Sequence, residues 1–230
     1  MNQAVHLSSQ FDEDLGALRT RVLQMGGVVE SQIRSAIEAY TSGNASVIES
    51  VVETESKVNQ LEIEIDDACA HIIAKRQPTA SDLRMVLAVS KIVTDLERAG
   101  DEAKKIATSS SNVHERGQVP SLRAAEIRHV AEAAVSMLRQ ALDCLARLDA
   151  ASARAVILAD KAVDSEFRAI VRQLITYMME DPRTISTALD IIWIARAIER
   201  IGDHAKNVAE QVIFVVEGRD VRHSGLELGN

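Results

Sequence analysis

The chain has 230 residues, of which 47% are hydrophobic, 26 are basic and 34 are acidic, so its formal net charge is −8. This length permits one or two domains, each with a sizeable core. Ten glycines and three prolines are about half the usual share, which argues against a β-sandwich or barrel with many tight turns. The acidic balance and only 3% aromatic residues disfavour nucleic-acid binding.

Several classes of protein are disfavoured by what the sequence lacks. It has no run of about 18 apolar residues, so we expect no membrane insertion, and its N-terminal segment does not look like a secretory signal. Cys69 and Cys144 form no Cys-x-x-Cys motif, which favours a reduced, cytoplasmic compartment. Phosphate loops, dinucleotide fingerprints and hydrolase motifs are also missing, so the sequence offers no nucleophile or phosphate-binding constellation.

Hydrophobic spacing predicts helices along almost the whole chain. In the first half, one helix begins near Ser8 or Ser9 and is broken at 42–44, a second ends before Pro78, and a third follows it. The stretch 108–120 then loses the helical period. Because this stretch is rich in Ser, Asn, Gly and Pro, we interpret it as a linker.

The helical period resumes after Pro120 and predicts three more helices. Before the last of them, Asp181-Pro182 is typical of an N-cap followed by proline at the first helical position. The final residues have no period and are interpreted as a flexible tail. The predicted division is a first bundle over 1–110, a linker over 111–120, a second bundle over 121–217 and a tail over 218–230.

The two halves of the sequence repeat each other, which is its strongest signal. Residues 96–101 match residues 198–203 at an offset of 102, and the second and fifth helices align at an offset of 105. Each half therefore consists of a long helical hairpin and a third helix, and three such helices can pack as a bundle. The predicted fold is all-α, with six long helices in two tandem three-helix bundles.

An acidic pair recurs in both halves. Glu97 and Asp101 are one helical turn apart, as are Glu199 and Asp203, so each pair lies on one face of its helix. Like charges at this spacing cost an exposed helix about 0.2–0.5 kcal/mol. One interpretation is a solvated acidic face, neutralised by nearby lysines and preserved by duplication. The other is a metal site.

A metal site is further supported by the second and fifth helices. At the positions that align between the two halves, these helices carry oxygen-bearing side chains at the same one-turn spacing. If each pair faces the third helix of its half, four oxygen ligands converge in each bundle. Oxygen-only ligands suit Mg²⁺, Mn²⁺, Ca²⁺ or ferric iron. The candidate metal ligands are Glu97, Asp101, Glu55 and Asn59 in the first half and Glu199, Asp203, Asp160 and Asp164 in the second.

Other reactive residues do not join the repeat. His71, His129 and His204 have no counterparts in the other half, so we predict surface or core positions for them rather than metal ligation. The Glu-x-x-His formed by Glu126 and His129 occurs once, whereas a ferritin-like di-iron centre needs two copies and two further glutamates. Trp193 either packs on the neighbouring helix of its hairpin or is an exposed anchor for a partner.

The tandem motifs LERAGDEAKKIA and IERIGDHAKNVAE resemble the duplicated Glu/Asp-x-x-x-Asp signature of the PhoU family of bacterial phosphate-signalling regulators. RQPTASDLRMVLAVSKIVTDLERAGD is similar to the family segment from QP-x-x-x-DLR to ERxGD, and the resemblance covers about residues 6–217. The second half departs from the pattern in having Ser186 at the position of Arg84. Ala99 also replaces a usually bulky residue. Neither change touches the acidic pairs.

The resemblance implies two three-helix bundles with metal ions, such as iron, zinc, magnesium or manganese, at the acidic motifs. The family's ligand positions correspond directly to Glu97, Asp101, Glu199 and Asp203. The upstream positions are matched more loosely by Glu55, Asn59, Asp160 and Asp164.

The resemblance also implies a regulatory role rather than an enzymatic one. The chain is then expected to be a negative regulator of phosphate uptake and of the phosphate-starvation response. It would act as a cytoplasmic, metal-binding adaptor between the ATPase subunit of the phosphate ABC transporter and a phosphate-sensing histidine kinase, and a homodimer is expected. The residues alone leave open a competing class, in which the same carboxylates serve a metal store or a metal-dependent enzyme.

Overall fold

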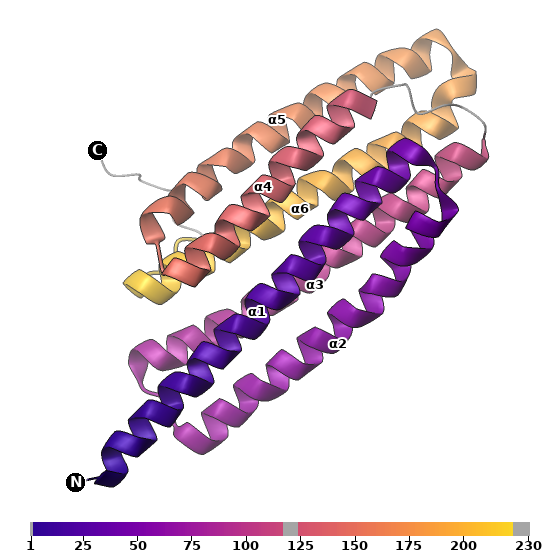
Figure 1. Cartoon of the computed structure of the whole chain (residues 1–230). Coiled ribbons are helices and arrows are strands. Elements are labelled where there is room, and N and C mark those ends of the chain that lie inside the picture. The colour runs from indigo at the N-terminus through magenta and orange to yellow at the C-terminus, as the bar shows by residue number, and fades with distance from the viewer. Residues whose placement is uncertain (1, 117–123, 223–230) are drawn as a thin grey trace, which may run out of the picture.

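The computed structural model describes residues 2–116 and 124–222, and its regular elements in these ranges are all helical (Figure 1). They are α1 (Asn2–Ser42), α2 (Ala45–Arg76), α3 (Ala80–Glu115), α4 (Ala124–Arg147), α5 (Ala150–Glu180), the 3₁₀ turn η1 (Pro182–Thr184) and α6 (Ile185–Glu217). The prediction of an all-α fold with six long helices is confirmed. Within these ranges, none of the helices has both the length and the apolar character needed to cross a membrane.

Local sequence signals set most of the helix ends. Between α1 and α2, Gly43 adopts a left-handed conformation (φ +65°) and the Asn44 side chain caps the first turn of α2. The Asp181 side chain accepts a hydrogen bond from the backbone N–H of Arg183 (3.0 Å), with Pro182 in the first turn. Asp181 therefore caps the 3₁₀ turn η1 and not α6 as predicted, because α6 begins at Ile185 and its N-cap Thr184 makes no side-chain cap bond. The predicted start of α1 near Ser8 is wrong, because α1 already begins at Asn2.

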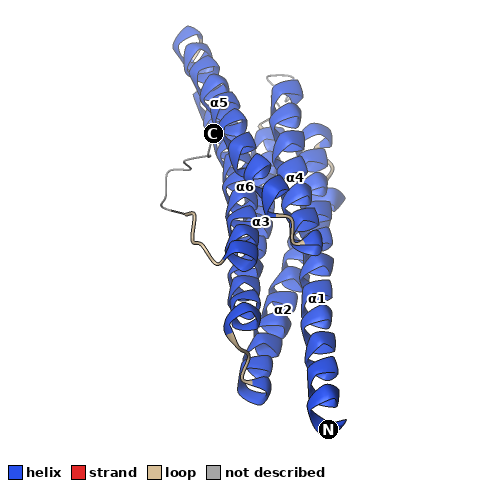
Figure 2. Ribbon diagram, turned by 90° about the vertical axis from the view of Figure 1, so that its left-hand side faces the viewer, coloured by secondary structure: helices blue, strands red, loops and turns tan. Residues whose placement is uncertain are grey.

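The helices form two bundles, α1–α3 and α4–α6, that lie against each other (Figures 1 and 2). The two central helices, α3 and α6, pack side by side, and α1 also contacts α4. Fully buried apolar side chains from both halves, such as Leu96 and Ile198, belong to one continuous cluster. The two bundles therefore share a hydrophobic core.

The C-terminal end of α3 corrects the predicted linker, because residues 108–115 continue the helix. Ser110 and Val113 are fully buried, and the Ser110 hydroxyl donates to the carbonyl four residues earlier (2.6 Å). Nε2 of His114 hydrogen-bonds the carbonyl of Tyr40 on α1 (2.9 Å). Tertiary packing thus overrides the weak helix propensity of Ser and Asn in this segment.

The predicted flexible tail is also partly wrong. Gly218 ends α6 in a left-handed conformation (φ +69°), and Val221 is only 8% exposed because it joins the hydrophobic core cluster. Within 218–222, Val221 is therefore packed into the core, whereas the other four residues are exposed. The predicted linker residues 117–120 and the tail residues 223–230 lie outside the described ranges.

Polar contacts join the two halves along α3 and α6. Oδ1 of Asp95 accepts hydrogen bonds from His204 Nδ1 (2.9 Å) and Asn207 Nδ2 (2.9 Å), and all three side chains are largely buried or half-buried. We call this set of contacts between α3 and α6 the seam. It also pairs Arg116 with Asp190 (2.9 Å), Arg200 with Glu102 (3.1 Å) and Lys91 with the ring of Phe214 (5.6 Å to its centroid).

Candidate metal centres

Three carboxylates of the first half converge between α2 and α3. One oxygen atom from each of Glu55, Glu97 and Asp101 lies within 4.8 Å of the other two. Glu55 is buried, and the two acids of α3 are half-buried. Because Glu97 and Asp101 are one turn apart, α3 itself sets them on one face, and α2 supplies the third group. The structure therefore brings three of the four predicted ligands of this half together.

Two amide side chains lie beside Glu55. Gln32 of α1, which is 2% exposed, donates from Nε2 to Glu55 Oε2 (3.0 Å) and to the carbonyl of Val51 (3.2 Å), while its Oε1 is buried without a partner. Asn59, the fourth predicted ligand, is exposed on the next turn of α2. With its nitrogen turned toward Glu55, it donates to Oε1 (3.1 Å). Glu55 is thus oriented by neighbours on two helices.

The glycine of the first motif makes room for this arrangement. A Cβ atom at Gly100 would lie 2.9 Å from Gln32 Oε1 and 3.3 Å from Glu55 Oε2. The absence of a side chain therefore allows these two polar groups to reach α3 beside the acidic pair. This contact gives the Gly of ERxGD a structural reason in the first half.

Burial and mutual repulsion raise the pKa values of acids in the first cluster. Burial raises the pKa of Glu55; the hydrogen bond from Gln32 opposes this rise and the charge of Asp101 adds to it. Burial also raises the pKa of Glu97, with the charges of Asp101 and Glu62 adding to it. A bound cation would relieve both penalties, since it favours the charged form of every carboxylate around it.

Glu62 is an acid that the sequence interpretation missed. It is half-buried on α2, and it lies near enough to Glu97 to raise the pKa of that group. The signal was present in the spacing, because Glu55, Asn59 and Glu62 follow one face of α2 at intervals of four and three residues. The repeat comparison hid Glu62, because its counterpart in the second half is Phe167.

The four predicted ligands of the second half also face each other, across α5 and α6. Asp160 and Glu199 are buried, and Asp164 and Asp203 are half-buried. Burial raises the pKa of Glu199, and the charge of Asp203 raises it further; burial and then the charge of Asp160 raise the pKa of Asp203. Among the described residues, however, only the first cluster brings three carboxylate oxygens within 4.8 Å of one another.

Basic side chains are a second difference between the clusters. Three of the four acids in the second cluster form ion pairs with Lys or Arg side chains, and two of these ion pairs are short. The ion pairs are Lys206 with Asp160 (2.8 Å), Arg196 with Glu199 (2.6 Å) and Arg168 with Asp164 (3.3 Å). The second cluster is therefore already partly neutralised.

The donor atoms of the first cluster fit a hard multivalent cation. They are carboxylate oxygens that are partly withdrawn from water, and the structure shows no imidazole or thiol among them. Such a set is typical of Mg²⁺, Mn²⁺, Ca²⁺ or ferric iron rather than of zinc, which favours nitrogen and sulfur ligands. In the second cluster, a cation would first have to displace Lys206 and Arg196.

The sequence matches the family model of the PhoU domain twice, over residues 22–110 and 127–212. This chain belongs to the PhoU family. Each matched segment lies within one of the two bundles, and together they contain all eight candidate ligands. The duplication inferred from the ERxGD motifs is therefore that of the PhoU domain.

Named PhoU relatives and solved PhoU structures span nearly the whole chain. A phosphate-specific transport system accessory protein PhoU homolog of Pseudomonas putida is 46% identical over 96% of this chain and 86% of its own length. The phosphate-specific transport system accessory protein PhoU of Escherichia coli K12 is 44% identical over 98% of this chain and 92% of its own length. The crystal structure of PhoU from Pseudomonas aeruginosa has a TM-score of 0.87 and 45% identity, and covers 91% of this chain and 100% of that chain.

The other residues that the sequence singled out lie apart from both clusters, except His204, which is close enough to Glu97 and Asp203 to act on the pKa values of both. His71 and His129 are exposed, whereas His204 is buried in the seam. Cys69 is buried, and burial raises its pKa to about 12, so its thiol is not poised to react. Trp193 is 64% exposed, so the interpretation that it packs on the neighbouring helix is wrong.

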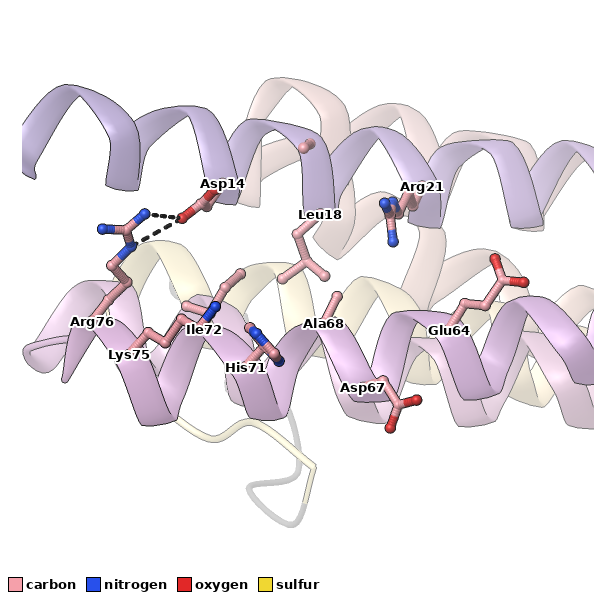
Figure 3. A pocket seen from close by; sticks show the side chains of 11 residues that line it. Asp14, Leu18, Arg21, Glu64, Asp67, Ala68, His71, Ile72, Lys75 and Arg76 are labelled. Carbon is pink, nitrogen blue, oxygen red and sulfur yellow. Dashed lines mark hydrogen bonds and ion pairs between the residues drawn. The ribbon is translucent and has the colours of Figure 1, made fainter.

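An open groove of about 430 Å³ lies between α1 and α2 (Figure 3). Asp14 and Arg76 form an ion pair across one end of it (3.0 Å), and Arg21 points from α1 toward α2. Its lining carries charges of both signs over an apolar floor that includes Leu18 and Ile72. None of the eight candidate ligands lines this groove, so it is separate from the two carboxylate clusters.

Proposed function

We propose that this PhoU protein is a negative regulator of phosphate uptake and of the phosphate-starvation response. The observation that carries this proposal is the double PhoU domain. It is supported by the match to relatives that are named accessory proteins of phosphate-specific transport, because the match extends over most of their length. The proposed site of action is the cytoplasm, where the protein turns over no substrate and acts through protein contacts.

The proposed partners are the ATPase subunit of the phosphate ABC transporter and the phosphate-sensing histidine kinase. Exposed apolar side chains support docking through a helix face: Ile185, Leu189 and Trp193 follow one another at four-residue steps on α6 and are 41%, 46% and 64% exposed. The same face could serve a homodimer. Purification from phosphate-replete cells, with Trp193→Ala as the comparison, tests whether this face captures either partner.

The proposed role of metal is to bind at the two carboxylate clusters. Bound cations would join α2 to α3 and α5 to α6, and could complete their coordination with a partner's carboxylates. Elemental analysis of the purified protein tests this, with a variant in which Glu97, Asp101, Glu199 and Asp203 are all alanine. Unchanged metal content in that variant would refute the sites.

The test of the regulatory role is a deletion strain grown in high phosphate. Alkaline phosphatase, a starvation reporter, should be switched on in this strain, and further deletion of the kinase should switch it off. A reporter that stays silent in the single deletion would contradict the proposal. The metal store or metal-dependent enzyme would then lead, because the convergence of Glu55, Glu97 and Asp101 favours it.

A further inference from the structure

We infer that the two carboxylate clusters bind cations unequally and that the first cluster is the primary cation site. In the first cluster, Glu62 is an additional ligand and Gln32 is a positioning residue. The second cluster binds a cation only when its own basic side chains are displaced. The inference rests on the proposed metal binding and adds a ranking and two residues to it. It comes from positions at which the two repeats differ.

Two substitutions between the repeats change the charge beside each acidic pair. Where the first half has Glu62 on α2 and Thr94 on α3, the second has Phe167 on α5 and Arg196 on α6. In the first half Glu62 is half-buried, and the Thr94 hydroxyl donates to the carbonyl of Ser90 (3.2 Å). In the second, the Arg196 guanidinium lies over the Phe167 ring (5.6 Å to its centroid) and donates to Glu199 (2.6 Å). The second half thus has an aromatic ring in place of the Glu62 carboxylate and a paired guanidinium in place of the Thr94 hydroxyl.

The lysine of the repeated motif also behaves differently in the two halves. Lys206 donates to Asp160 Oδ2 (2.8 Å). Its counterpart Lys104 lies near enough to Glu55 to lower the pKa of that group, but among the described residues it forms no ion pair. A cation entering the first cluster therefore meets carboxylates that repel one another. A cation entering the second must break existing charge-assisted hydrogen bonds.

Gln32 supports the first cluster from α1. Its amide holds one oxygen of Glu55 and is itself fixed by the carbonyl of Val51, which leaves Glu55 Oε1 on the side of Asn59. The buried, unpartnered Oε1 of Gln32 lies against Gly100 beside the cluster. A preoriented carboxylate loses less freedom when it binds a cation, so Gln32 raises affinity without itself being a ligand.

Mn²⁺ binding to the full-length protein, measured by titration calorimetry, tests the ranking. Glu199→Ala/Asp203→Ala leaves the first cluster, and Glu97→Ala/Asp101→Ala leaves the second. We expect at least tenfold tighter binding when the first cluster remains. Equal affinities, or the reverse order, would overturn the inference while leaving metal binding intact. No binding in wild type would instead overturn the proposed metal role.

Exchanging the residues that differ tests the cause. Glu62→Phe/Thr94→Arg should weaken Mn²⁺ binding by the first cluster at least tenfold, and Phe167→Glu/Arg196→Thr should strengthen binding by the second. Because these changes could affect folding, the near-isosteric Glu62→Gln should also weaken the first cluster about tenfold. The matched control is Glu64→Gln, an exposed acid that lines the groove between α1 and α2. Equal effects of these two variants would remove Glu62 from the site.

Gln32 has its own test, because a positioning residue and a merely structural residue give different results. Gln32→Leu should weaken Mn²⁺ binding by the first cluster about threefold to tenfold and leave the second cluster unchanged. Gln32→Glu retains the length of the side chain but removes the amide that donates to Glu55 Oε2 and to the carbonyl of Val51, so it should also fail to position Glu55. Full affinity in Gln32→Glu would show that the amide does not act by positioning. If Gln32→Leu lowers thermal stability but not Mn²⁺ affinity, the positioning role is wrong.

Discussion

Gly100 and Gly202 hold the same place in the repeated ERxGD motif but have different surroundings. A Cβ at Gly100 would press against Gln32 Oε1 at 2.9 Å, whereas the nearest atom to a Cβ at Gly202 is Val163 Cγ1 at 3.4 Å, an ordinary contact. Each glycine lies within its helix, so the local backbone is alike. The neighbouring helices decide whether the glycine is needed.

At the seam, too, equivalent positions of the two halves make different contacts. Asp95 joins the two halves through His204, whereas the counterpart of Asp95 is Ala197, a buried apolar residue. Duplication therefore gave the halves a common fold and motif, and later substitutions gave equivalent positions different contacts. Variants at paired positions can break or sharpen this comparison.

The largest effect is expected at the seam. Asp95→Ala leaves the largely buried donors of His204 and Asn207 without their acceptor, which should lower the free energy of unfolding by about 2–3 kcal/mol. Asp95→Asn keeps one acceptor oxygen and should cost less than half as much. Urea denaturation followed by circular dichroism measures both. A loss below about 0.5 kcal/mol for Asp95→Ala would show that the seam adds little stability.

The paired glycines should respond to alanine with opposite signs. Gly202→Ala should stabilise the protein by up to about 1 kcal/mol, because alanine favours the helix and the added methyl group has room. Gly100→Ala must displace the buried amide of Gln32 and should destabilise by about 1–2 kcal/mol. Thermal denaturation of both variants decides this. Similar changes in Tm would remove the contrast.

The pH dependence should reveal the buried acids of both halves. Burial raises the pKa of Glu55, Glu97, Glu199 and Asp203, so the folded state binds their protons more tightly than the unfolded state. Their contribution to stability is full below the ordinary pKa and is lost as the pH rises through the raised pKa. The metal-free protein should therefore gain Tm as the pH falls from 7 toward 5.

Neutral variants provide the control for this pH dependence. Glu55→Gln/Glu97→Gln and Glu199→Gln/Asp203→Asn should each flatten the rise in Tm, because each removes two of the titrating groups. If neither double variant changes the slope, other groups of the protein govern its pH dependence.

The smallest effect concerns repulsion within the acidic pairs. Without metal, Glu97→Gln should raise the free energy of unfolding by about 0.2–0.5 kcal/mol, because it relieves repulsion from Asp101. Glu199→Gln should gain nothing, since it also weakens the contact with Arg196. Saturating Mn²⁺ should reverse the gain for Glu97→Gln. A larger gain at position 199 would contradict the difference between the clusters.

The sequence allowed the helices, the duplication and the pairing of Glu97 with Asp101 to be predicted, because each depends on periodicity within a helix or on comparison of the two halves. The missed features depend on contacts between helices. Arg196 reads as an ordinary surface residue until α5 places Phe167 beneath it. Residues 108–115 are helical because side chains such as Val113 are buried against other helices. The helix propensities of the residues give no information about this burial.

The seam has a consequence for synthesis of the chain on the ribosome. The face of α3 that carries Asp95 and Glu102 pairs with α6, the last helix to be made, about a hundred residues later in the sequence. At about 5–20 residues per second, the nascent first half waits roughly 5–20 s for that partner. During this interval a folded first bundle presents an uncovered helix face, on which a chaperone or a neighbouring nascent chain can act before α6 closes it.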